Sequence, residues 1–158
     1  MAINMRITSE LLKLKAIEFE KKLNGFCRYE RSRILLLINK DLSDEEFVLY
    51  CIFDDVISDW DNGHDKFGSF EVIPDLFAEF IGWTPSKIRR ILKSLITKGF
   101  IAFLGMNMYV MVGVELKKHK RVRDVPFDYY AELKKLVETH LIKSSTNHND
   151  DAKSNPLN

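Results

Sequence analysis

Apolar residues recur at three- and four-residue spacing along residues 85–98, which predicts an amphipathic helix. These positions are Ile88, Ile91, Leu92, Leu95 and Ile96. Thr84 suits the N-cap of this helix, and Pro85 suits its first position, where a missing N–H costs nothing. Gly99 predicts the end of the helix, because glycine adopts the left-handed conformation common just after a C-terminus.

A shorter helix is predicted over residues 74–81, and Gly82 ends it. Only two residues then separate Gly82 from the helix that begins at Pro85. Two helices joined by a tight turn containing glycine form a helix-turn-helix arrangement. The sequence therefore predicts this arrangement for residues 74–98.

Three short stretches around these helices favour strands. Residues 100–104 and 108–114 predict the two strands of a hairpin that turns at Gly105-Met106-Asn107. Residues 69–73 alternate apolar and polar side chains and predict a third strand. A third strand is expected because an isolated hairpin is only marginally stable in water.

Before the first strand, Ser43 and Glu46 predict a capping box that opens a helix running to about residue 59. Helical periodicity is also present over residues 7–23. Residues 28–39 contain an apolar run that favours either a short helix or an extended arm docked on the core, and periodicity alone does not decide between them.

A last helix is predicted over residues 126–141, and the polar residues from 143 onward predict a disordered tail. The helices over 7–23 and 126–141 either pack on the common core or form the seam of a homodimer. We therefore divide the chain into an N-terminal helical extension, a central domain, a basic segment with the C-terminal helix, and a tail, at residues 1–40, 41–116, 117–142 and 143–158.

Charge is segregated along the chain, although the net charge is only +1. Residues 41–79 hold one Lys/Arg against twelve Asp/Glu, whereas residues 80–123 hold ten against one. A cationic segment that coincides with the predicted helix pair indicates a basic working face for a polyanion.

The order of helix, short strand, two helices and hairpin resembles the winged helix-turn-helix family. The resemblance rests on residues 43–59, 73–81, 84–99 and 100–113, and residues 95–101 resemble the junction between recognition helix and wing. The opening Leu-Ser-Asp-Glu-Glu-Phe is similar to phage or plasmid replication-initiation proteins and DnaD-type primosome proteins. The resemblance implies an α+β, mainly helical winged helix-turn-helix fold, with added N- and C-terminal helices and a small antiparallel sheet.

This resemblance implies a double-stranded DNA-binding protein of the replication-initiation or transcription-regulator type, with residues 85–98 in the major groove. Between Thr84 and Lys98 there are five cations and no carboxylate, where a merely solvated helix face usually mixes both signs. Arginine pairs bidentately with guanine, and lysine suits phosphates. The candidate DNA-binding residues are Thr84, Ser86, Lys87, Arg89, Arg90, Lys93, Lys98, Asn107, Lys117, Lys118, Lys120, Arg121 and Arg123.

Two features of the sequence have two possible interpretations each. The basic run over residues 117–123 is either a phosphate clamp or an exposed linker. Trp83 either contacts the sugar–phosphate backbone or packs over the junction of the two helices. As a whole, the winged scaffold could instead serve as a protein–protein interaction module of a replication or transcription assembly, with the acidic residues 41–79 as its surface.

Other chemistries find little support in the sequence. The four histidines lack metal-ligand spacing, and a calcium loop starting at Asp59 would need a glutamate where Phe70 stands. We expect no metal, no cofactor and no enzymatic activity. Cys27 and Cys51 lack the spacing of a redox or zinc motif, which favours a reducing cytoplasm. Apolar runs are too short to cross a bilayer, so no membrane partner is expected.

Overall fold

The computed structural model describes residues 30–61, 63–118 and 128–151, together with Glu10, Lys13, Leu14 and Ile17. Within these residues the fold is α+β and mostly helical, with one three-stranded antiparallel sheet. Apart from those four residues, the helix predicted over residues 7–23 lies outside the described residues. The same holds for residues 119–127, in which the basic run ends and the last helix was predicted to start.

The continuous described part of the chain starts at residue 30. Its first elements are a 3₁₀ turn, η1 (Arg31–Ile34), and one helical turn, α2 (Leu35–Ile38). Of the two alternatives for residues 28–39, the short helix is therefore present over residues 31–38. Leu36 is fully buried in the core. The segment consequently docks on the domain as a packed element.

The capping box predicted at Ser43 is confirmed. Its hydroxyl accepts from the Glu46 N–H, and the Glu46 carboxylate accepts from the Ser43 N–H, at 3.3 Å in both directions. This box opens α3 (Asp44–Ile52), which continues as the π-helical turn η2 (Phe53–Ile57). The helix thus ends close to the predicted residue 59.

Helices α4 (Pro74–Ile81) and α5 (Pro85–Thr97) follow the short strand β1 (Ser69–Glu71), as predicted. Strands β2 (Ile101–Gly105) and β3 (Met108–Met111) form the hairpin, and the sheet order is β1-β3-β2. Strand β3 ends before the predicted residue 114, because the chain turns at residues 112–114 into the short helix α6 (Glu115–Lys118).

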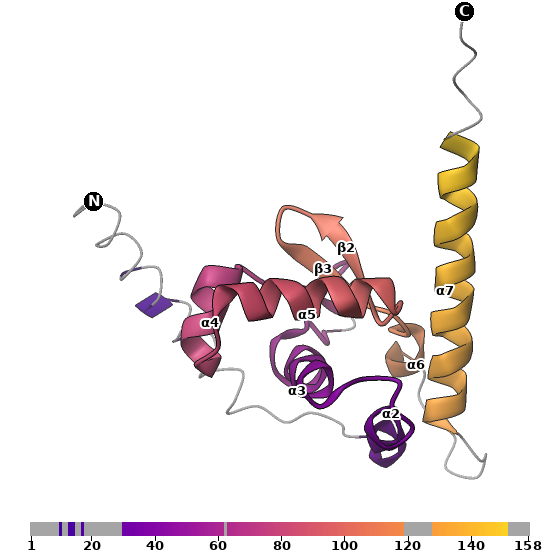
Figure 1. The fold of residues 1–158 in the computed structure, drawn as a ribbon, viewed down its shortest axis with the longest axis horizontal. Coiled ribbons are helices and arrows are strands. Elements are labelled where there is room, and N and C mark those ends of the chain that lie inside the picture. Colours follow the sequence, from indigo (N-terminus) through magenta and orange to yellow (C-terminus); the bar gives the residue numbers. More distant parts are fainter. Residues whose placement is uncertain are drawn as a thin grey trace, which may run out of the picture.

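The last helix, α7 (Tyr129–Asp151), stands beside α6 and extends past the rest of the domain (Figure 1). Its Leu133 and Val137 are buried, and a Cβ atom on Gly113 would lie only 2.8 Å from the Leu133 side chain. Gly113 also has a φ of +90°, so both backbone and space require glycine there. Of the two alternatives for this helix, packing on the common core is therefore the observed one.

The disorder predicted from residue 143 is wrong as far as Asp151, because α7 continues to that residue. A helix that is already held by its first turns can be extended without a new nucleation cost. Polar side chains in this part also form hydrogen bonds with the backbone of the same helix. Ser144 donates to the His140 carbonyl and Thr146 donates to the Ile142 carbonyl, each at 2.9 Å. Residues 152–158 lie outside the described residues.

A buried ion-pair network joins η1 and α6 to the π-helical turn η2. Arg33 lies 2.7 Å from Asp54 and 2.6 Å from Asp55, and Arg33 and Asp54 are each only 2% exposed. Lys117 of α6 also contacts Asp54, at 3.1 Å. The π-helical turn therefore presents two successive carboxylates to cations from η1 and α6.

We predict that Arg33→Met lowers the free energy of unfolding by about 3 kcal/mol, because Asp54 and Asp55 would lose their buried partner. Urea denaturation followed by circular dichroism measures this loss. Arg31→Met, on the same turn but exposed, is the matched control and should stay close to wild type. Equal stability of the two variants would contradict a stabilising role for the network.

Candidate nucleic-acid interface

Three residues set the angle at which α5 leaves α4. Gly82 ends α4 in the left-handed conformation with a φ of 70°, which glycine adopts without strain. Thr84 then caps α5 by accepting from the Lys87 N–H at 3.3 Å, and Pro85 occupies the first helical position. These local preferences were all visible in the sequence and are confirmed.

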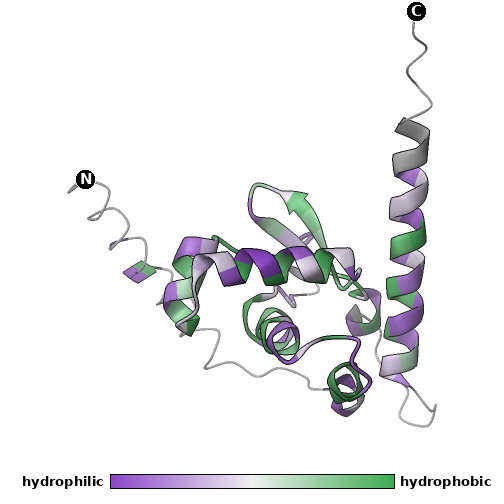
Figure 2. Ribbon diagram, in the orientation of Figure 1, coloured by the Kyte–Doolittle hydropathy of each residue, from purple (hydrophilic) through white to green (hydrophobic). Residues whose placement is uncertain are grey.

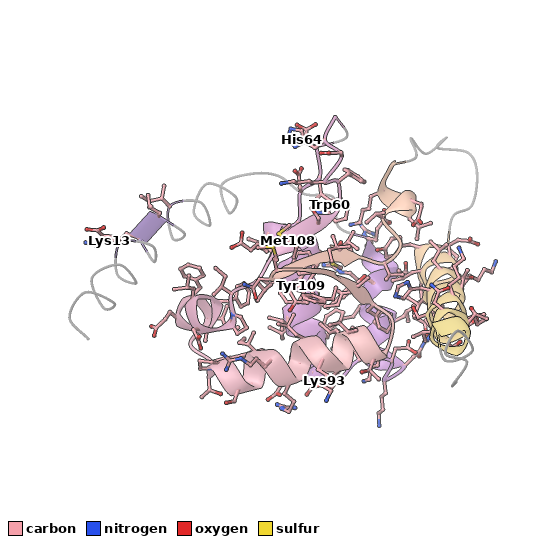
Figure 3. The ribbon with its side chains drawn as sticks, turned by 90° about the horizontal axis from the view of Figure 1, so that it is seen from above. Lys13, Trp60, His64, Lys93, Met108 and Tyr109 are labelled. Atoms are coloured by element: carbon pink, nitrogen blue, oxygen red, sulfur yellow. The ribbon has the colours of Figure 1, made fainter. Side chains whose placement is uncertain are left out.

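The two faces of α5 differ sharply, as the alternating colours along the helix in Figure 2 show. Ile88, Ile91, Leu92 and Leu95 are at most 3% exposed and pack into the core formed with α3 and α4. Lys93 lies on the side of α5 that faces away from the sheet (Figure 3). The outer face also carries the other exposed side chains of the helix, Ser86, Arg89, Arg90 and Thr97.

Carboxylates from α3 and α4 meet most of the cations on α5. Glu45 contacts both Lys87 and Arg90, at 2.9 Å each. Asp75 of α4 lies 3.1 Å from Arg89. The sequence-based picture of a carboxylate-free cationic helix is therefore incomplete, because the acidic start of α3 folds alongside it.

Arg89, Arg90 and Lys93 nevertheless remain accessible. The Arg89 and Arg90 side chains are 55% and 66% exposed despite their ion pairs. Lys93 is exposed and makes no ion pair within the described part of the chain. The acidic loop around His64, whose Asp59 and Asp61 pair with that histidine, lies on the opposite side of the molecule from Lys93 (Figure 3).

Glu46 connects the start of α3 to the end of α5. Besides capping α3, its carboxylate accepts from Ser94 at 3.1 Å and from Lys98 at 2.9 Å. Burial raises the pKa of Glu46, but the hydrogen bonds from Lys98, Ser43 and Ser94 outweigh this effect and leave the pKa below its ordinary value. Lys98 is therefore engaged within the domain and is only 38% exposed.

A groove runs between α2, the start of α3 and α5. It is lined by three cations, two carboxylates and three further residues, namely Lys40, Arg90, Lys98, Asp44, Glu45, Leu37, Leu42 and Ser43. Lys40 was missed at the level of sequence, because it precedes the capping box outside any periodic segment. Its neighbours in the groove come from positions up to 58 residues away, which no local pattern reveals.

Trp83 belongs to the junction rather than to an open surface. Its ring packs against the core cluster, and the Lys87 ammonium lies 4.0 Å from the ring centroid. Of its two interpretations, packing over the helix junction is the one that the contacts favour. The cation–π contact also fixes Lys87 in place beside Glu45.

The remaining candidate residues separate from α5. Lys117 is 15% exposed, contacts Asp54 and lies over the Trp60 ring, so in this arrangement it serves a core ion pair and is withdrawn from any phosphate clamp. Asn107 is exposed at the hairpin turn, with a φ of 65°. Lys118 ends α6, and nothing of its side chain is described; Lys120, Arg121 and Arg123 lie outside the described residues.

Among residues 30–61, 63–118 and 128–151, no group of three or more His, Cys, Asp or Glu side chains could hold a metal ion. None of the described helices is long and apolar enough to cross a membrane. Burial raises the pKa of the Cys51 thiol to about 11, which keeps it protonated at neutral pH.

Comparison with protein-family models, with curated proteins and with solved structures found no significant match.

The Glu46 network makes a pH-dependent prediction. Because the folded-state pKa is lowered, the carboxylate stabilises the fold above its unfolded pKa of about 4.5, and this contribution is lost as the pH falls below that value. We expect Glu46→Gln to cost about 1 kcal/mol at neutral pH and progressively less in acid. Urea denaturation midpoints of Glu46→Gln and wild type, measured from neutral pH to below about 4.5, test this prediction.

Asp44→Asn is the control, since Asp44 is exposed and lies beside Glu46 in the first turn of α3. Asp44→Asn should lower the free energy of unfolding less than Glu46→Gln does at neutral pH. Its difference from wild type should also not shrink in the same way as the pH falls. A Glu46→Gln deficit that stays constant with pH would contradict the assigned role.

Proposed function

We propose that the chain binds double-stranded DNA and that α5 enters the major groove. The observation that carries the proposal is the exposed trio Arg89, Arg90 and Lys93 on the free face of a helix whose opposite face is buried. The turn at Gly82 and the hairpin after α5 support a winged helix-turn-helix scaffold for this surface.

The ion pairs of α5 are compatible with this role. Ion pairs between exposed side chains contribute little to stability and are readily exchanged, because water screens them. A phosphate or a guanine edge can therefore replace Glu45 at Arg90, or Asp75 at Arg89. The carboxylates then act as competitors that lower affinity for any polyanion and disfavour poorly fitting ones.

The groove beside α5 extends the proposed surface. Three cations and two carboxylates border it, so a phosphate following the major-groove contact would meet cations there in competition with the carboxylates. The hairpin offers no cation to a phosphate, because residues 100–114 contain no charged side chain. Phosphate contacts are consequently assigned to α5 and its groove, and a role in replication initiation or transcription regulation follows from the resemblance noted above.

The first test is the double variant Arg89→Ala with Arg90→Ala in a fluorescence anisotropy titration with duplex DNA. Loss of two phosphate or base contacts should weaken binding and reduce the slope of log affinity against log salt by about 2. The matched control is Lys135→Ala with Lys143→Ala, which removes two exposed cations from α7. Unchanged binding in the α5 variant, or an equal loss in the control, would contradict the assignment.

The second test removes the competitor. Glu45→Gln frees Lys87 and Arg90 from their shared carboxylate, so we expect tighter DNA binding and a steeper salt dependence than wild type. Glu138→Gln, an exposed carboxylate on α7, is the control for the change in net charge. Weaker binding by Glu45→Gln would indicate that this glutamate positions the cations rather than competes for them.

A second candidate function is a protein–protein interaction module of a replication or transcription assembly. It is favoured by the exposed apolar residues of the hairpin, among which Met106 is 93% exposed. This candidate predicts a protein that co-purifies in stoichiometric amount and no retention of DNA even at low salt. DNA binding that depends on Arg89 and Arg90 would decide against it.

A further inference from the structure

The hairpin has an open edge of unusual composition. In the sheet order β1-β3-β2, the outer side of β2 pairs with no other strand in the described part of the chain. Phe103 and Leu104 on this strand are 56% and 58% exposed. Charges, proline or a β-bulge commonly block further pairing at an exposed edge strand. Strand β2 has no charge and no proline, and its one register irregularity lies between Phe103 and Gly105.

The backbone of this edge is available at Phe103. The Val112 N–H donates to the Phe100 carbonyl, so these two residues form a hydrogen-bonded pair of the β2–β3 ladder. In an antiparallel ladder, hydrogen-bonded residue pairs alternate with pairs that share no hydrogen bond. Phe103 pairs with Tyr109 three positions further along, so the N–H and carbonyl of Phe103 point away from β3. The register becomes irregular between Phe103 and Gly105, which leaves Phe103 near the end of the regular edge.

An aromatic row leads from the core to the same residue. Phe53 stacks on Phe70 with ring centroids 4.5 Å apart, and Phe70 stacks on Tyr109 at 5.8 Å. Tyr109 then contacts Phe103 at 5.3 Å, and the row stops there at an exposed ring. Phe103 is therefore an exposed aromatic ring at the outer end of this row.

Part of α7 lies next to the residue that precedes β2. A Cβ atom on Gly99, two residues before β2, would lie 2.8 Å from the Leu141 side chain, which places that part of α7 next to the start of the strand. Leu141 is 37% exposed and Ile142 is 65% exposed. Leu141 is thus a partly exposed apolar side chain beside the start of β2.

We propose that this edge is the contact between two copies of the chain, paired about a two-fold axis at Phe103. In such a contact the same patch meets itself, so a charged patch would repel its copy whereas a neutral one is self-complementary. Residues 100–114 carry no charge in a chain of which 30% is charged. Antiparallel pairing of two β2 strands also satisfies both open edges and extends each aromatic row. The inference is independent of DNA binding.

Light scattering on the 158-residue chain after gel filtration tests the contact. Wild type should show twice the mass of the 18.5 kDa chain at high concentration and dissociate on dilution. Phe103→Lys opposes two cations at the two-fold axis and should raise the dissociation constant roughly tenfold or more. Ile38→Lys, at a side chain that is 62% exposed on α2, is the matched control and should remain dimeric.

A charge-reversal pair makes the test specific for the axis. Phe103→Glu alone should also be monomeric, whereas an equimolar mixture of Phe103→Glu and Phe103→Lys should recover the dimer through an opposite-charge pair. Circular dichroism of each variant confirms folding. If substitutions at Phe103 unfold the chain, Leu104→Lys replaces them, because Leu104 lies on the same edge.

Three results would overturn the proposal. These are a monomeric wild type at high concentration, a dimer that survives substitution of both Phe103 and Leu104, and a dimer lost equally in Ile38→Lys. Occupation of the edge by a different protein in place of the second copy would appear as the first of these results.

Discussion

The packing of the apolar face of α5 onto α3 is the constraint on which the rest of the arrangement depends. Ile88 and Leu95 are fully buried at this contact, and Ile91 and Leu92 nearly so. Burying such side chains contributes roughly 1.5–3 kcal/mol each, which far exceeds what exposed ion pairs supply. The apolar stripe therefore decides which cations face outward, and the carboxylates of α3 and α4 adapt to that choice.

The same contact explains why the acidic and basic segments meet. The capping box at Ser43 places Asp44, Glu45 and Glu46 in the first turn of α3, where carboxylates stabilise the helix. Once α3 packs against α5, this turn lies beside Lys87, Arg90 and Lys98. A local helix signal and a long-range electrostatic contact thus share the same residues, and the surface proposed for DNA is a mixture of available cations and competing carboxylates.

How much the sequence predicts depends on the range over which each interaction acts. Helices α4 and α5, their turn and the hairpin could be predicted, because apolar spacing, Thr84 and Gly82 act within a few residues. The pairing of Arg90 with Glu45, 45 residues apart, leaves no periodic signal, and neither does the burial of Arg33 against Asp54. Lys117 shows the same limit: in sequence it belongs to a basic run, while in the fold it reaches a buried aspartate. The continuation of α7 to Asp151 was missed because it follows from attachment to a packed helix rather than from composition.

The proposed contact with DNA requires that the cations of α5 be available to a polyanion. The most direct measurement is the affinity of the unmodified protein for duplex DNA over a series of salt concentrations. Availability of Arg89, Arg90 and Lys93 predicts binding at low salt, with log affinity falling linearly as log salt rises. No binding at low salt, or an affinity that does not change with salt, would mean that the carboxylates beside α5 already neutralise it.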